Sequence, residues 1–165
     1  MSEDINNTHS DEQGSDTAVP CMLLSLVEGQ MLVPTVTVAE MAPIQPFDII
    51  PNTPDWFLGY YPWRNLRVPV LSYETMNVKS SPKIGAQGRV AVLNNTGLSD
   101  RVPFLGVLIQ DIPRMVTIEE HHLVEDTSFE KGPFDLMPIK IGEEQAVMPD
   151  IEGIEKAVVE LNLLR

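Results

Sequence analysis

The stretch NTPDWFLGYYPWRNLRVPVLSY, from Asn52 to Tyr73, decides the fold. It joins a turn signal to an aromatic connector and then to a short apolar strand, which we expect over residues 66–73. Within it, Arg64 carries a charge that no physiological pH removes. Composition alone leaves two interpretations equal, a corner of the core or a protein interface, because Trp, Tyr and Arg dominate interface hot spots. Five of the chain's ten aromatic residues precede Arg64 here: Trp56, Phe57, Tyr60, Tyr61 and Trp63.

Short β-strands separated by turns are expected over most of the remaining sequence. The 14 Pro among 165 residues disfavour long helices. Only residues 151–161 have a helical pattern, with Asp150 as the N-cap. Seven or more short strands indicate a mainly β fold, either one barrel or a pair of small barrels, rather than βαβ units. Besides 66–73, the expected strands cover residues 21–27, 31–38, 89–93, 102–109, 114–118, 137–141 and 145–148.

Composition limits the organisation and the compartment. Residues 1–18 form an acidic polar segment that we expect to be a disordered tail, followed by one folded domain over 19–165. The single Cys21 excludes an internal disulfide and suits a reducing compartment. The sequence shows neither a signal peptide nor an apolar run of the roughly 20 residues that a membrane span requires. We therefore expect a cytoplasmic protein that does not insert into membranes.

The charge distribution favours a protein partner over a nucleic acid. The formal net charge is −13, so the chain repels phosphate at long range. Residues 61–101 nevertheless carry a charge of +4, between flanking blocks of −9 and −8. A locally positive band in an acidic protein suits electrostatic steering of another protein.

Motifs for catalysis or metal binding are weak. The run EEHH at 119–122 contains ligand types, but on a strand neighbouring side chains face opposite ways, so a solvated loop is favoured. Asp111, Asp126 and Asp135 are candidates for an acid/base pair, without a pattern that brings them together. We expect no catalytic residue, no cofactor and no metal site.

The order of several motifs resembles the CheW family of chemotaxis adaptors. Arg64 stands five residues before Pro69, as the arginine of the family does before its strand proline. Three departures, Trp63, Asn65 and Gln110, indicate a divergent branch, similar to the CheW-like adaptors of systems that control type IV pili and twitching motility. The matching segments cover about residues 20–160: VAEM at 38–41, NTP at 52–54, Gly59, VPV at 68–70, GVLI at 106–109 with Ile112 and Met115, and AVMPDIE at 146–152.

The resemblance implies two SH3-like five-stranded β-barrels around a shared core, with a short C-terminal helix. It implies a non-catalytic adaptor that couples the cytoplasmic tip of a methyl-accepting chemoreceptor to a CheA-type histidine kinase in two-component signal transduction. The protein-binding residues that it implies are Arg64, Val38, Glu40 and Asn65. The stretch 52–73 becomes the expected hinge between the two barrels.

Two other classes stay open. One is an SH3-like binding module outside chemosensing, which would share the fold but not the partners. The other is a small carboxylate-dependent enzyme, which would need a perturbed Asp or Glu in a closed pocket.

Overall fold

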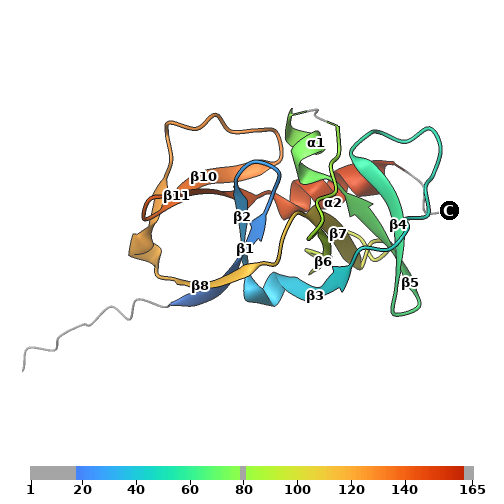
Figure 1. Ribbon diagram of the computed structural model, residues 1–165, viewed down its shortest axis with the longest axis horizontal. Coiled ribbons are helices and arrows are strands. Elements are labelled where there is room, and N and C mark those ends of the chain that lie inside the picture. Colours follow the sequence, from blue (N-terminus) through green and yellow to red (C-terminus); the bar gives the residue numbers. More distant parts are fainter. Residues whose placement is uncertain (1–17, 79–80, 162–165) are drawn as a thin grey trace, which may run out of the picture.

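The computed structural model of the protein describes residues 18–78 and 81–161, so the predicted tail lies outside them except for its last residue. The described residues form two β-sheets that lie side by side along the long axis (Figure 1). The first sheet has the strand order β8 (Arg114–Ile118), β1 (Val19–Ser25), β2 (Gln30–Pro34), β11 (Glu144–Pro149), β10 (Asp135–Ile141), β9 (Leu123–Glu125). The second has the order β3 (Val38–Pro43), β6 (Arg89–Asn94), β7 (Phe104–Ile109), β5 (Leu66–Leu71), β4 (Phe57–Trp63).

The mainly β prediction is confirmed, with one difference in strand number. The second sheet has the expected five strands, whereas the short β9 brings the first to six among the described residues. The predicted hairpin near the C-terminus is present as β10 and β11, joined by a tight turn in which Gly142 has a φ of 62°. The predicted final helix is α2 (Ile151–Glu160), and Asp150 caps it by accepting a hydrogen bond from the Gly153 amide at 3.0 Å.

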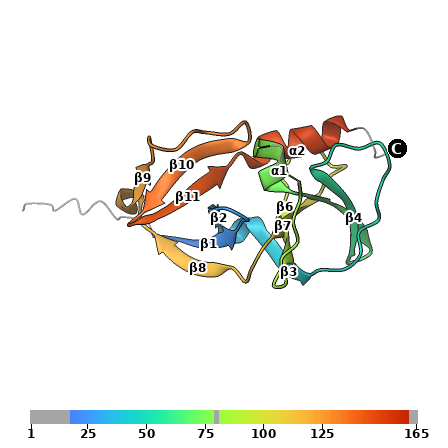
Figure 2. The same ribbon diagram turned by 45° about the horizontal axis from the view of Figure 1, so that its top comes forward.

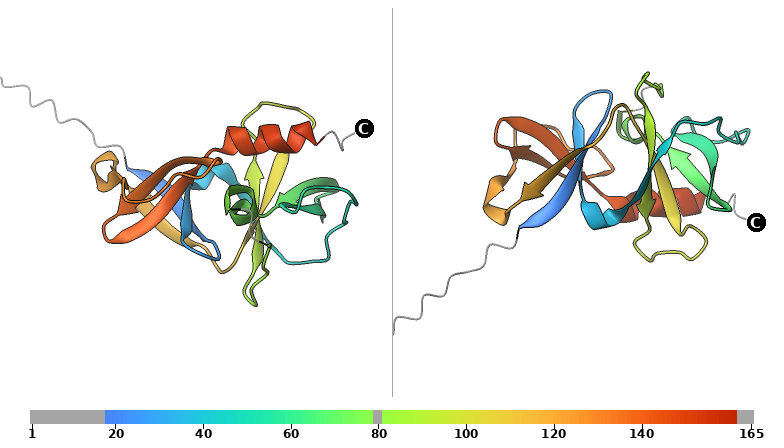
Figure 3. Two further views of the ribbon diagram at one scale, coloured as in Figure 1. Left: turned by 90° about the horizontal axis from the view of Figure 1, so that it is seen from above. Right: turned by 60° about the horizontal axis from the view of Figure 1, so that its bottom comes forward.

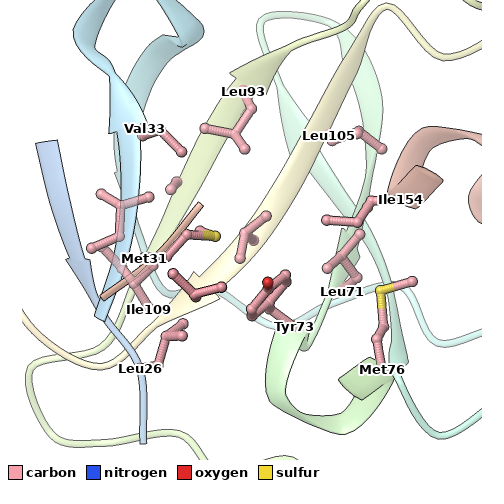
Figure 4. Close-up of a cluster of buried hydrophobic side chains, with 14 of the residues drawn as sticks. Leu26, Met31, Val33, Leu71, Tyr73, Met76, Leu93, Leu105, Ile109 and Ile154 are labelled. Atoms are coloured by element: carbon pink, nitrogen blue, oxygen red, sulfur yellow. The ribbon is translucent and has the colours of Figure 1, made fainter. Parts of the chain in front are cut away.

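The core has three parts: one cluster within each sheet and a central cluster that both sheets share. Along β6, Val90 and Val92 face the cluster of the second sheet, whereas Ala91 and Leu93 face the central cluster. Both faces of this strand are therefore buried, which explains its unbroken apolar run. Figure 4 shows the central cluster, in which side chains from the two sheets and both helices meet: Leu26, Met31, Val33, Leu71, Tyr73, Met76, Leu93, Leu105, Ile109 and Ile154 are labelled.

Helix α2 packs on the second sheet and holds a buried carboxylate. Figure 3 (left panel) shows the helix lying along this sheet, and its Ile154 and Val158 belong to the central cluster. The fully buried Glu155 accepts hydrogen bonds from the Thr96 amide and hydroxyl, at 2.8 and 2.6 Å, and from the Ser99 amide at 3.2 Å. The carboxylate thus ties the turn after β6 to the helix.

The strand expected over residues 31–38 is correct only as far as Pro34. Pro34 ends β2, and the 3₁₀ turn η1 (Thr35–Thr37) leads into β3, which begins at Val38. Proline has no amide hydrogen for a strand ladder, which suits the end of a strand. The chain crosses between the sheets at η1 and returns at residues 110–113, after β7.

The stretch 52–73 also differs from the prediction. Its aromatic connector is the strand β4, which pairs with β5 as an antiparallel hairpin. The expected strand 66–73 ends at Leu71, and the short helix α1 (Tyr73–Val78) follows, with the Ser72 hydroxyl accepting a hydrogen bond from the Thr75 amide at 3.3 Å. Both strands lie in the second sheet. The stretch is therefore not a hinge between the two sheets.

Candidate functional site

The β4–β5 hairpin turn places Arg64 and Asn65 at its tip. The register pairs Trp63 with Leu66, so the loop consists of Arg64 and Asn65 alone. Their φ angles are 45° and 63°. Two consecutive residues with positive φ define the tight turn that matches the twist of a β-hairpin. Asparagine tolerates this conformation far better than most residues. Asn65, which departs from the family glycine, therefore suits the geometry of the turn.

Glu40, Trp63 and Arg64 form a compact group that we call the Glu40–Arg64 cluster. The indole Nε1 of Trp63 donates a hydrogen bond to the Glu40 carboxylate, and an Arg64 guanidinium nitrogen lies 3.6 Å from the same carboxylate oxygen. The guanidinium carbon lies 4.5 Å from the centre of the Trp63 ring, within the range of a cation–π contact. The indole also contacts the ring of Phe104 edge-on, with ring centres 4.7 Å apart.

This cluster closes the second sheet. β3, which carries Glu40, and β4, which carries Trp63, are the two edge strands of that sheet. A second contact joins the same edges, because the Tyr61 hydroxyl donates to the Pro43 carbonyl at 2.7 Å. Trp63 is 7% exposed, whereas the Arg64 side chain is 66% exposed. The cluster thus holds Arg64 against a buried ring while leaving its charge open to a partner.

Val38 lies on the same strand as Glu40 but faces a different part of the molecule. It is half-buried and packs against the central cluster. Nearby, the register aligns Val33, Met22 and Met115 across β2, β1 and β8, so that their side chains share one face. Burial falls along this row: Val33 is buried, Met22 is half-buried, and Met115 is 59% exposed. The face of the first sheet that covers the core therefore continues as an exposed apolar surface.

Two further exposed apolar side chains sit on the crossovers between the sheets. Val36, in η1, is 86% exposed, and Ile112, between β7 and β8, is 64% exposed. With Val38 and the outer end of the methionine row, they define what we call the crossover surface, comprising Met22, Val36, Val38, Ile112 and Met115. Val36, Ile112 and Met115 are exposed, whereas Met22 and Val38 are half-buried. Exposed apolar side chains are typical of a surface that binds another protein when they lie together.

Arg67 forms a second arginine–aromatic group that sequence reasoning missed. Its guanidinium lies 2.5 Å from the Asp48 carboxylate and 4.2 Å from the centre of the Tyr60 ring. Burial raises the pKa of the Tyr60 hydroxyl. Recognising β4 as a strand would have predicted the contact between Arg67 and Tyr60. Arg67 pairs with Pro62 in the hairpin, and Tyr60, two residues from Pro62, lies on the same face of the strand. This group ties residue 48 to the hairpin.

Of the three carboxylates that the sequence offers for an enzyme, two line one cleft, and hydrogen bonds hold both of them. Asp126 and Asp135 line a cleft of about 740 Å³, and Asp111 is not among its lining residues. Asp126 accepts hydrogen bonds from the amide and hydroxyl of Ser128, which hold the pKa of its carboxyl below the usual value. Asp135 accepts from the buried Tyr73 hydroxyl and from a backbone amide, and burial raises the pKa of that hydroxyl. These hydrogen bonds give both carboxylates a structural role in the fold.

The geometric reason given against a metal at residues 119–122 is wrong. Glu120–His122 form the 3₁₀ turn η2 rather than a strand, so their side chains do not alternate between two faces. The turn instead brings ligand atoms of Glu119, His121 and His122 to within 4.8 Å of one another.

No helix in the described ranges is long and apolar enough to cross a membrane.

Comparisons with known proteins agree with the geometry. The family model of the CheW-like domain matches residues 20–158. The fold is similar to the crystal structure of the scaffolding protein TtCheW from Thermoanaerobacter tengcongensis, with a TM-score of 0.68 and 15% sequence identity over 81% of this chain and 84% of that one. A search of the curated proteins finds no match.

Proposed function

Because this chain belongs to the CheW-like domain family, we propose that it is a non-catalytic adaptor that couples chemoreceptors to a CheA-type histidine kinase. The observation that carries the proposal is the Glu40–Arg64 cluster, which presents a fixed and exposed arginine on the closed edge of the second sheet. An arginine whose guanidinium is already ordered loses little side-chain entropy on binding, which favours a hot spot.

The crossover surface supports a helical partner. Its exposed apolar side chains include Val36, on the crossover between the sheets, and Met115, on the edge strand β8 of the first sheet. An amphipathic helix buries its apolar face in such a surface, and the cytoplasmic tip of a chemoreceptor has this chemistry. We assign the receptor tip to the crossover surface and Arg64, with Val38, Glu40 and Asn65 in supporting roles. The kinase then binds one of the two barrels.

The pathway and compartment follow from the same proposal. The adaptor works in the cytoplasm, in a two-component chemosensory system whose output is the control of type IV pili and twitching motility. The scaffolding role of TtCheW supports a protein that acts by binding and geometry alone.

Two alternatives share the fold but differ from this proposal in partners or in activity. An SH3-like module outside chemosensing would use the same surfaces for other ligands. An enzyme is disfavoured because the hydrogen bonds of Asp126 and Asp135 fix both carboxylates.

Co-purification tests the proposal. Wild-type protein and the Arg64→Ala variant are used as baits in lysate of the source organism, and bound proteins are identified by mass spectrometry. The proposal expects a histidine kinase and a methyl-accepting receptor with the wild type, and loss of the receptor with the variant. Enrichment of neither partner by the wild type would refute it.

A further inference from the structure

The 3₁₀ turn η2 gathers three metal-ligating side chains that the proposed adaptor function does not use. The turn is closed by a hydrogen bond from the His122 amide to the Glu119 carbonyl at 2.9 Å. It carries His121 and His122, whose ring centres lie 4.1 Å apart, with Glu119 directly before it. A four-residue segment with a fixed backbone therefore supplies two imidazoles and one carboxylate.

The spacing of these groups fits a tetrahedral metal ion. A carboxylate oxygen of Glu119 lies 3.3 Å from Nε2 of His121. Two ligands of one tetrahedral Zn²⁺, each about 2.0–2.2 Å from the ion, are separated by about 3.4 Å. All three ligand atoms lie within 4.8 Å of one another, and the exposed His122 side chain has room to turn toward a shared ion.

The chemistry of the set selects the class of metal. Imidazole nitrogen suits zinc and the neighbouring late transition metals, whereas Mg²⁺ and Ca²⁺ prefer oxygen ligands. Two histidines and one glutamate form a known zinc ligand set that leaves a coordination position for water. Among the described residues, no second group of three or more His, Cys, Asp or Glu side chains has this spacing.

We propose that Glu119, His121 and His122 bind one Zn²⁺ ion at the η2 turn. The turn joins β8 to β9, which are the two edge strands of the first sheet. A bound ion would therefore restrain the segment that connects these two edge strands. Figure 2 shows β9 at one end of the long axis and β4, which leads into Arg64, toward the other end. Zinc binding is thus separate from the proposed adaptor site, and the two proposals can fail independently.

Isothermal titration of the full chain, without a histidine tag, tests this site. ZnCl₂ is titrated at pH 7.5 after treatment with EDTA and its removal, and MgCl₂ is titrated in parallel. The expected result is one Zn²⁺ per chain with a Kd on the order of micromolar, and no binding of Mg²⁺. His122→Ala and Glu119→Gln should each weaken zinc binding by roughly tenfold or more, because each removes one of three ligands.

Matched variants separate the site from adventitious binding. His9→Ala removes the third histidine of the chain, and Glu120→Gln changes a carboxylate within the same turn that is not part of the ligand group. Both should bind zinc as the wild type does. As a second readout, a given zinc concentration should raise the thermal unfolding midpoint of the wild type by more than that of His122→Ala. Absence of 1:1 zinc binding, equal affinity in His122→Ala, or loss in His9→Ala would each overturn the proposal.

Discussion

Substitutions at Glu40 separate closure of the second sheet from presentation of Arg64. Glu40→Ala removes both the acceptor for the buried Trp63 indole and the partner of the Arg64 guanidinium. Glu40→Gln keeps a carbonyl oxygen that can accept from the indole, and it removes only the charge. The two variants therefore differ in whether a buried donor is left without an acceptor.

The structure sets the expected magnitudes. A hydrogen bond to a charged acceptor contributes about 1.5–3 kcal/mol, whereas an exposed ion pair contributes about 0.2–1 kcal/mol. The Arg64 and Glu40 side chains are 66% and 43% exposed, so the smaller figure applies to their pair. We expect Glu40→Ala to lower the free energy of unfolding by about 2–4 kcal/mol, and Glu40→Gln to lower it by about 1 kcal/mol.

Urea unfolding, followed by tryptophan fluorescence and circular dichroism, measures both values. Glu28→Ala, at an exposed position in the β1–β2 turn, is the control and should be neutral. If Glu40→Gln costs as much as Glu40→Ala, the ion pair rather than the indole bond dominates, and our reasoning about closure is wrong. If neither variant changes the unfolding midpoint, the cluster does not close the sheet.

Three further predictions concern stability. Glu155→Ala leaves three hydrogen-bond donors without their acceptor, so denaturant unfolding should show a loss of at least about 3 kcal/mol; a loss below 1 kcal/mol would contradict this role. Gly59→Ala places a Cβ 2.6 Å from the Asp48 carbonyl oxygen at a φ of 127°, and should lower the free energy of unfolding by about 2–4 kcal/mol in the same assay. The hydrogen bond from Ser128 lowers the pKa of Asp126 in the folded state. The ionised Asp126 carboxylate therefore stabilises the fold at pH values above the ordinary carboxyl pKa, and this stabilisation is lost as the pH falls through the lowered pKa. Thermal melts between pH 6 and pH 2 should show a smaller acid loss in Asp126→Asn, and identical curves would refute the assignment.

The sequence predicted most strands correctly where one pattern dominated. The strand at 89–93 was predicted from its continuous apolar run, and the hairpin near the C-terminus was predicted from the glycine in its turn. The strand β4 was missed because Tyr60 and Tyr61, which face opposite sides, are both buried. Burial on both sides leaves no alternation for a strand pattern to detect. The aromatic cluster therefore resembled a connector.

Short elements account for the other errors. Helix α1 spans six residues, too few for a helical period to show, although Ser72 as a cap and Glu74 in the first turn were available signals. Turn η2 lies in the segment expected to be a solvated loop, but its three-residue length leaves too little pattern to predict a 3₁₀ turn. For the site, the family resemblance named both Arg64 and Glu40 as protein-binding residues, and this role stays a prediction; the structure brings the two side chains into contact. The second arginine group at Arg67 depended on hairpin pairing that only the structure supplied.

The most direct test of the adaptor proposal is a calorimetric titration of the two proposed partners from the same organism. The regulatory domain of the histidine kinase and a fragment of the chemoreceptor tip are each titrated into wild-type protein and into Arg64→Ala. We expect the wild type to bind both. The variant should keep its circular dichroism spectrum and lose about 2 kcal/mol or more of receptor binding, roughly a 30-fold weaker Kd. Failure of the wild type to bind either partner, or equal receptor affinity in the folded variant, would contradict the proposal.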